Sequence, residues 1–223
     1  MGDKNKDDMA LPPWAKALSQ ITPFSAVPEA YYSAKIDEIQ KKRENVFFEE
    51  LSKGNLSITQ ETLNQNDLLR KIEVAMRATY RTQREEKIKM LAHLILGSED
   101  DNVLTDIDEF EYYLTIVDEL NYRELVLLSV LDRYYQELRD KDFATQKELI
   151  DAVKPIWPEF LSEAASELAI NEFEVENMLQ RLASSGCFEF FIGYGDPTGG
   201  ILTHTYDRIR AILKRGAKKI VSL

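Results

Sequence analysis

The alternation of hydrophobic and polar positions predicts a mainly helical protein. Apolar side chains recur at the helical period over residues 29–53 and 66–96, and a glycine follows each segment. A third helix is expected over 107–120, after an acidic segment at 98–108 that favours a linker or a bend. These helices form an expected N-terminal long-helix bundle, with residues 1–28 as a disordered or loosely packed lead-in.

The C-terminal part of the chain contains shorter elements with clear boundaries. Residues 123–138 are apolar on nearly all sides, which predicts a central, buried helix. Prolines and capping residues then mark three short helices, expected over 145–153, 158–168 and 171–184.

A hairpin pattern follows these helices. Residues 187–194 and 201–205 are the expected strands, the sequence GDPTGG between them is typical of a turn, and 206–214 is expected to form a closing helix. The order of elements resembles a winged-helix domain over residues 121–223, although the extra helix at 145–153 departs from that pattern. The alternative is an α+β tail in which the hairpin only covers a helical core.

The two expected domains, a helical domain at 29–120 and a winged-helix-like domain at 121–223, are both acidic. The net charge is −11; residues 121–223 hold 13 Lys+Arg against 16 Asp+Glu, a net −3 that leaves −8 for residues 1–120. Such a charge repels nucleic acid at long range. The single cysteine and the lack of an apolar run of about 20 residues favour a cytoplasmic protein with no membrane contact.

Most of the chain between residues 20 and 135 is similar to a loose group of uncharacterised bacterial helical proteins. The segments that support the likeness are KKRENVFFEEL, RATYRTQREEKIKMLAHLIL and DEFEYYLTIVDELNYRELVLL, followed by the winged-helix-like end. Some proteins of this group lie near prophage or defence genes. The resemblance therefore implies a bacterial accessory or phage-related role, and it supplies no known catalytic residue.

The helix expected at 171–184 has an unsuitable charge for contacting DNA. Glu172, Glu174 and Glu176 lie near its start, and Arg181 is its only cation. Because phosphates repel such a helix, its acidity favours a protein partner. Cations gather instead near the end of the chain, at Arg208, Arg210, Lys214, Arg215, Lys218 and Lys219. The simpler explanation is a helix whose cations favour its own C-terminus, and the alternative is a contact with nucleic acid.

A row of arginines is the best lead in the second long helix. Arg77, Arg81 and Arg84 share one face by helical spacing, and such a row is suited to bind phosphates or an acidic partner helix. The favoured interpretation is pairing along the same helix, of Glu73 with Arg77 and of Arg81 with Glu85, on a solvated face.

No catalytic, cofactor or metal site is expected. His93 lies among apolar residues, where a lone histidine is normally packed and hydrogen-bonded. Two histidines and one cysteine at no recognisable spacing are too few for zinc, and Cys187 opens a strand as a small hydrophobe. A nucleophilic pairing of Cys187 with His204 lacks an orienting group. The acidic segment around Asp100 lacks the spacing of a calcium loop.

Three functions are compatible with these patterns. The favoured hypothesis is a non-enzymatic bacterial interaction or regulatory protein that acts through protein contacts or self-association. The second is a winged-helix DNA-binding transcriptional regulator, and the third is an enzyme with an unrecognised site. The residues expected to contact a partner are Arg77, Arg81, Arg84, Glu172, Glu176, Arg181, Lys214 and Arg215.

Overall fold

A computed structural model describes residues 29–54, 56, 66–99, 106–139, 141, 143–191 and 199–221. The expected lead-in at 1–28 and most of the acidic segment, including Asp100 and Asp101, lie outside these residues. The chain divides into two compact units, Met1–Lys42 and Arg43–Leu223, and each is described by itself.

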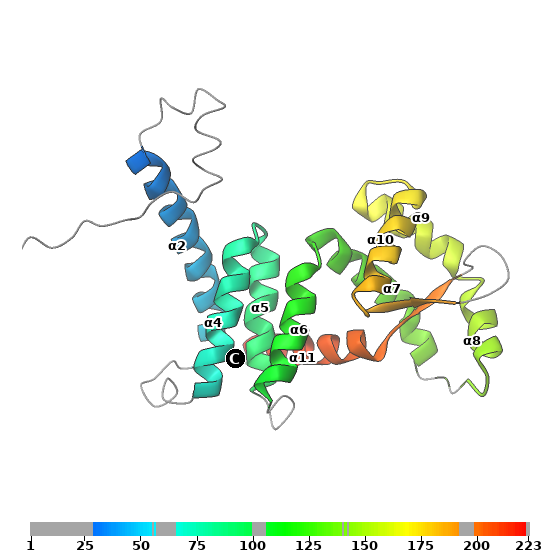
Figure 1. Cartoon of the computed structure of the whole chain (residues 1–223). Coiled ribbons are helices and arrows are strands. Elements are labelled where there is room, and N and C mark those ends of the chain that lie inside the picture. Colours follow the sequence, from blue (N-terminus) through cyan, green and yellow to red (C-terminus); the bar gives the residue numbers. More distant parts are fainter. Residues whose placement is uncertain are drawn as a thin grey trace, which may run out of the picture. The chain divides into compact units, whose positions relative to one another are not determined.

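The described residues are mainly helical with one small antiparallel sheet, so the predicted mainly α class with a single β-hairpin is confirmed (Figure 1). The helices are α2 (Glu29–Lys53), α4 (Asn66–Arg81), α5 (Glu85–Ser98), α6 (Ile107–Glu119), α7 (Tyr122–Arg139), α8 (Gln146–Val153), α9 (Trp157–Leu168), α10 (Glu172–Ser184) and α11 (His204–Val221). The strands are β1 (Phe188–Phe190) and β2 (Gly200–Leu202), in which Phe188 is opposite Leu202. β2 is shorter than the predicted strand at 201–205, and β1 ends at Phe190; residues 192–194 of the predicted first strand and the turn residues 195–198 lie outside the described residues.

In the first unit, the described residues are 29–42, the N-terminal part of α2. Lys35 and Glu38 form an exposed ion pair at 2.6 Å along this helix. Tyr31 and Ile39 are largely exposed. The helix begins at Glu29 and ends at Lys53, as its apolar spacing predicted.

The second long helix was wrongly predicted as one continuous segment. The structure has two helices, α4 and α5, because Thr82 to Arg84 leave the helical conformation; Arg84 has φ −87° and ψ 122°. Neither proline nor glycine lies at this break. Contacts with other parts of the chain stabilise the break instead. Thr82 is buried, and the Lys87 ammonium donates hydrogen bonds to the backbone oxygens of Asp118 and Leu120.

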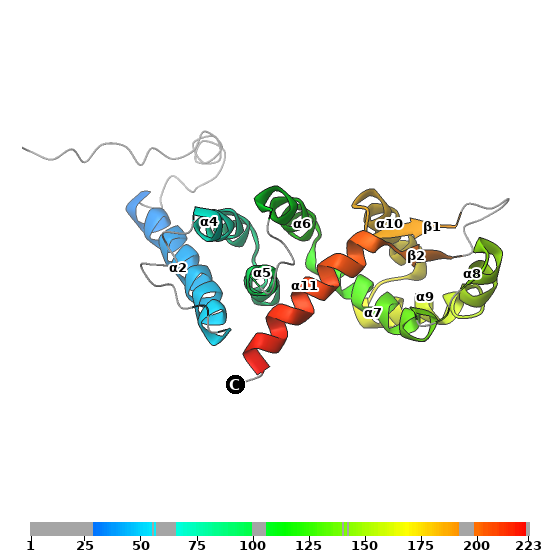
Figure 2. The ribbon, with the colours of Figure 1, turned by 90° about the horizontal axis from the view of Figure 1, so that it is seen from below.

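Within the second unit, α4, α5 and α6 lie side by side, and α11 packs along α5 (Figures 1 and 2). Two glycines allow a close crossing: a Cβ on Gly97 would lie 2.0 Å from the backbone oxygen of Ile212, and one on Gly216 would lie 2.1 Å from that of His93. α11 is longer than the predicted closing helix at 206–214. The predicted domain boundary after residue 120 stays a prediction, and apolar contacts between α5 and α11 extend across it.

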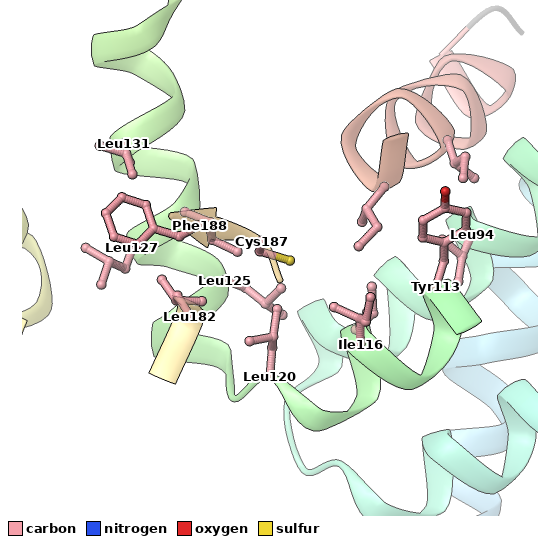
Figure 3. Packing of buried hydrophobic residues seen from close by; sticks show 14 of the residues in the cluster. Leu94, Tyr113, Ile116, Leu120, Leu125, Leu127, Leu131, Leu182, Cys187 and Phe188 are labelled. Carbon is pink, nitrogen blue, oxygen red and sulfur yellow. The ribbon is translucent and has the colours of Figure 1, made fainter. Parts of the chain in front are cut away.

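The helix α7 buries most of its apolar residues, as the sequence predicted, but Arg123, Ser129 and Arg133 leave one side of it exposed. Leu127 and Leu131 are fully buried beside Phe188 of the hairpin (Figure 3). The Tyr135 hydroxyl donates a hydrogen bond to the backbone oxygen of Gly200, which fixes β2 to α7. The hairpin therefore packs on α7 through both an aromatic side chain and a backbone contact.

Candidate protein interface

A capping box stabilises the start of α10, and an apolar stripe on one side packs the helix against its neighbours. The Asn171 side chain accepts a hydrogen bond from the Glu174 backbone N–H at 2.9 Å, and the Glu174 carboxylate accepts one from the Asn171 N–H at 3.1 Å. This predicted cap is confirmed. Val175, Leu179 and Leu182 are fully buried and pack α10 against α9, α7 and β1.

The opposite side of α10 is exposed and acidic around one aromatic ring. Phe173 is 71% exposed, the highest value among the large hydrophobic side chains that the structure describes. Glu172 and Glu176 are also exposed, and helical spacing places Glu176 on the same side as Phe173. We call the surface of Glu172, Phe173, Glu176, Asn177 and Gln180 the α10 outer face.

The single cation of α10 is paired with a buried carboxylate. Arg181 Nε lies 2.9 Å from Oε1 of Glu124, whose side chain is 1% exposed. A capping box at the start of α7 fixes Glu124: its carboxylate accepts from the Asn121 N–H at 2.8 Å, and its own N–H donates to the Asn121 side chain at 3.0 Å. Because Arg181 faces Glu124, it leaves the glutamates of the outer face without a paired cation on α10.

The sequence did not lead us to predict a role for Glu124, although it contains a capping pattern at this position. Asparagine followed three residues later by glutamate, ahead of an apolar run, is the same capping pattern that predicted the start of α10. The pairing of Glu124 with Arg181 joins helices whose paired residues are 57 positions apart in the chain, and local spacing carries no information on such a contact.

The arginine row of α4 is neutralised by partners. Arg77 pairs with Glu73 along the helix, as the favoured interpretation predicted. Arg81 pairs with Asp118 of α6, and Lys89 lies 2.9 Å from Glu85; the pairing of Arg81 with Glu85 stays a prediction.

Arg84 does not share the helical row, because it lies at the break between α4 and α5. Its guanidinium lies over the Tyr122 ring, 5.5 Å from the centroid. A polar pocket of about 380 Å³ lies at this break, and its lining includes Arg81, Arg84, Lys87 and Asp118. Burial lowers the pKa of Lys87, against the opposing pull of Asp118 and Glu124. The cations of this pocket therefore already have intramolecular partners.

The cations of α11 divide into a paired and an exposed set. Arg208 lies 3.6 Å from Glu109, and Arg210 lies 2.7 Å from Asp132. The exposed set comprises Lys214, Arg215 and Lys218. This set extends toward the C-terminal end of the helix, where cations are favoured by the helix dipole.

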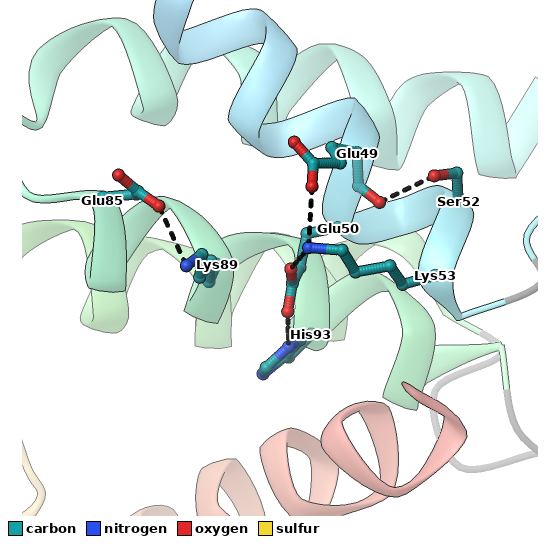
Figure 4. Close-up of polar contacts among 7 residues, drawn as sticks. All are labelled: Glu49, Glu50, Ser52, Lys53, Glu85, Lys89 and His93. Atoms are coloured by element: carbon teal, nitrogen blue, oxygen red, sulfur yellow. Dashed lines mark hydrogen bonds and ion pairs between the residues drawn. The ribbon is translucent and has the colours of Figure 1, made fainter. Parts of the chain in front are cut away.

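The two histidines and the cysteine lie in different elements: His93 in α5, Cys187 directly before β1 and His204 at the start of α11. His93 is packed and hydrogen-bonded, as predicted: its Nε2 lies 2.8 Å from Glu50 Oε1 (Figure 4). Cys187 is fully buried, and this burial raises the pKa of its thiol. His204 is exposed at the start of α11. Among the described residues, no group of three or more His, Cys, Asp or Glu side chains is placed to hold a metal ion.

No protein-family model, curated protein or solved structure matches the chain. In the part of the chain that the structure describes, no helix has both the length and the apolar character needed to cross a bilayer. The function is therefore inferred from the geometry of the α10 outer face and of the cationic surfaces.

Proposed function

We propose that this chain is a non-enzymatic bacterial interaction or regulatory protein that binds a protein partner through the α10 outer face. The main support for this proposal is the exposure of Phe173, whose side chain is 71% exposed between acidic residues. Exposed aromatic side chains are enriched where proteins bind each other, and they dominate the binding energy when a partner pocket covers them. The partner that fits is a protein surface with an apolar pocket and a cationic rim.

The winged-helix-like organisation of residues 121–223 belongs to this proposal. Its support is the order of α7, α9, α10, β1 and β2, in which α10 follows α9 directly and the hairpin follows α10. In such a domain α10 is the helix that would enter a DNA groove. Glu172 and Glu176 repel phosphate there, and Arg181 is engaged by Glu124, so the same helix suits a protein partner better. The resemblance to bacterial proteins supports a phage- or defence-related role, and the single cysteine supports a cytoplasmic location.

The second candidate is a DNA-binding regulator, and the exposed Lys214, Arg215 and Lys218 of α11 favour it. This function requires affinity for duplex DNA that falls steeply as salt rises. The variant K214Q/R215Q/K218Q is then expected to lower both the affinity and the salt slope.

Photo-crosslinking tests the favoured function directly. A photoreactive amino acid at position 173 is compared, in cells of the source organism, with one at the exposed Asp151 of α8. We expect a discrete adduct from position 173 alone, and its loss in E172K/E176K, since charge reversal opposes a cationic rim. Truncation of a central aromatic residue typically weakens binding by more than tenfold, so F173A is expected to do the same with the purified pair.

A duplex titration between 50 and 200 mM salt, with light-scattering mass measured alongside, separates the candidates. Failure to bind DNA together with a partner adduct or a concentration-dependent mass supports the protein interface. Salt-sensitive DNA binding that K214Q/R215Q/K218Q removes and F173A leaves intact would overturn it.

A further inference from the structure

A second cavity lies where α11 passes α5, α6 and α7. Its volume is about 200 Å³, and most of its wall is apolar: Met90, Val117, Leu120, Leu125, Leu128 and Leu213. Figure 3 shows Leu120, Leu125 and Cys187 near one another beside this region. The cavity shares no lining residue with the α10 outer face, so it is independent of the proposed interface.

One side of this cavity is charged. The Arg210 guanidinium and the Asp132 carboxylate, 2.7 Å apart, both line it, and the exposed Lys214 lies one residue beyond the Leu213 wall. Arg210 and Lys214 carry two positive charges and Asp132 one negative charge, so the charged side of this largely apolar cavity has a net charge of +1. The Ser129 hydroxyl, also in the lining, adds a hydrogen-bonding group.

We propose that this cavity binds a small apolar carboxylate, of the size of one aromatic ring with a short acidic side chain. An apolar cavity of about 150 Å³ stays dry and accepts a benzene-sized molecule, so about 200 Å³ leaves room for a ring and a linker. The hydrocarbon part lies against Leu125 and Leu128, and the carboxylate faces Lys214 and Arg210. This arrangement matches the usual ligand site, in which an apolar wall gives affinity and few polar groups fix orientation.

Cys187 provides a direct measurement, because it lines the cavity and is the single cysteine of the chain. Its buried thiol reacts with a disulfide reagent only when the surrounding structure opens. Phenylacetate is the probe. By mass action, a ligand that binds the closed form slows labelling about tenfold at ten times its Kd. We therefore expect the labelling rate of the full chain to fall hyperbolically as phenylacetate is added.

Variants separate occupancy of the cavity from general effects. L128F fills the cavity, and L213F, at a half-buried position, narrows it with less risk to folding; circular dichroism checks both folds. We expect either folded variant to lose the protection. K214Q is expected to weaken phenylacetate binding about two- to fivefold, the range of exposed ion pairs. K218Q, on the same helix but outside the cavity, is the matched control and is expected to leave the affinity for phenylacetate unchanged.

The neutral analogue 2-phenylethanol tests the charge requirement, since it keeps the ring and linker. We expect its protection to be about two- to fivefold weaker than that of phenylacetate at low salt. No protection by phenylacetate, equal protection by the alcohol, or full protection in both L128F and L213F would each overturn the proposal.

Discussion

The crossing of α5 and α11 makes the substitution G216A a sharp test of the fold. A Cβ at this position would lie 2.1 Å from the backbone oxygen of His93, and real Cβ atoms essentially never approach within 3.0 Å of another heavy atom. The blocking atom belongs to a helix backbone, so the two helices must separate by about 1 Å to relieve the overlap. We expect G216A to destabilise the protein.

Two opposing effects set the size of this change. Replacing glycine by alanine inside a helix gains about 1 kcal/mol from helix propensity alone. Overpacking costs about 1–3 kcal/mol, and a backbone clash of this depth belongs at the upper end or above it. The expected net loss in the free energy of unfolding is therefore about 2 kcal/mol, measured by urea denaturation followed by circular dichroism.

The sign of the G216A effect decides the test. Ala211 is exposed on α11, and A211G is the matched control; it reports the alanine-to-glycine change without the crossing and is expected to cost about 1 kcal/mol. If α11 did not pack on α5, G216A would stabilise the protein by about the amount that A211G costs. A stabilised G216A would therefore refute the close crossing of these helices.

Three further outcomes are expected. Burial raises the pKa of Glu50, but the hydrogen bonds to His93 and Lys53 outweigh this effect and lower that pKa below 4.5. The lowered pKa adds to the free energy of unfolding above pH 4.5, and this contribution is lost as the pH falls through the lowered value. Unfolding titrations should therefore show that the free energy of unfolding of E50Q falls less steeply in acid than that of the wild type. Y135F removes the hydroxyl bonded to the hairpin backbone and leaves a buried carbonyl unpaired, which should lower the free energy of unfolding by about 1–2 kcal/mol in urea melts. T145A removes the cap of α8, in which the Thr145 hydroxyl accepts a hydrogen bond from the Glu148 backbone N–H at 3.3 Å. Backbone hydrogen exchange should therefore speed up in α8 by the equivalent of about 1 kcal/mol, while exchange in α10 stays unchanged.

The sequence predicted the elements whose boundaries depend on local chemistry. The capping box at Asn171, the proline start of α9 and the apolar period of α2 all act within a few residues, so their signals are present in the sequence alone. The break at Thr82 has no such local signal. It depends on contacts between α5 and the carbonyls at the end of α6, which only the folded chain brings together.

The same distinction holds for the candidate sites. The acidity of α10 is visible in the sequence, but the exposure of Phe173 is not, because an aromatic residue at the start of a helix normally packs against the core. The arginine row differs from its prediction for a related reason. Helical spacing indicated Glu85 as the partner of Arg81, and the folded chain adds Asp118 from another helix.

The ion pair between Arg181 and Glu124 restricts how α10 could move when the proposed partner binds. Glu124 is buried and also caps α7, so moving α10 away from α7 would leave a carboxylate without its cation in a poorly solvated place. Removal of one partner from a buried pair costs more than the pair itself contributes, although the exposure of Arg181 at 66% reduces this penalty. The α10 outer face is therefore presented by a helix whose first turn is fixed by the Asn171 cap and whose last turns are tied to α7 by Arg181. Such preorganisation favours binding without rearrangement, since little conformational entropy remains to be lost when a partner docks.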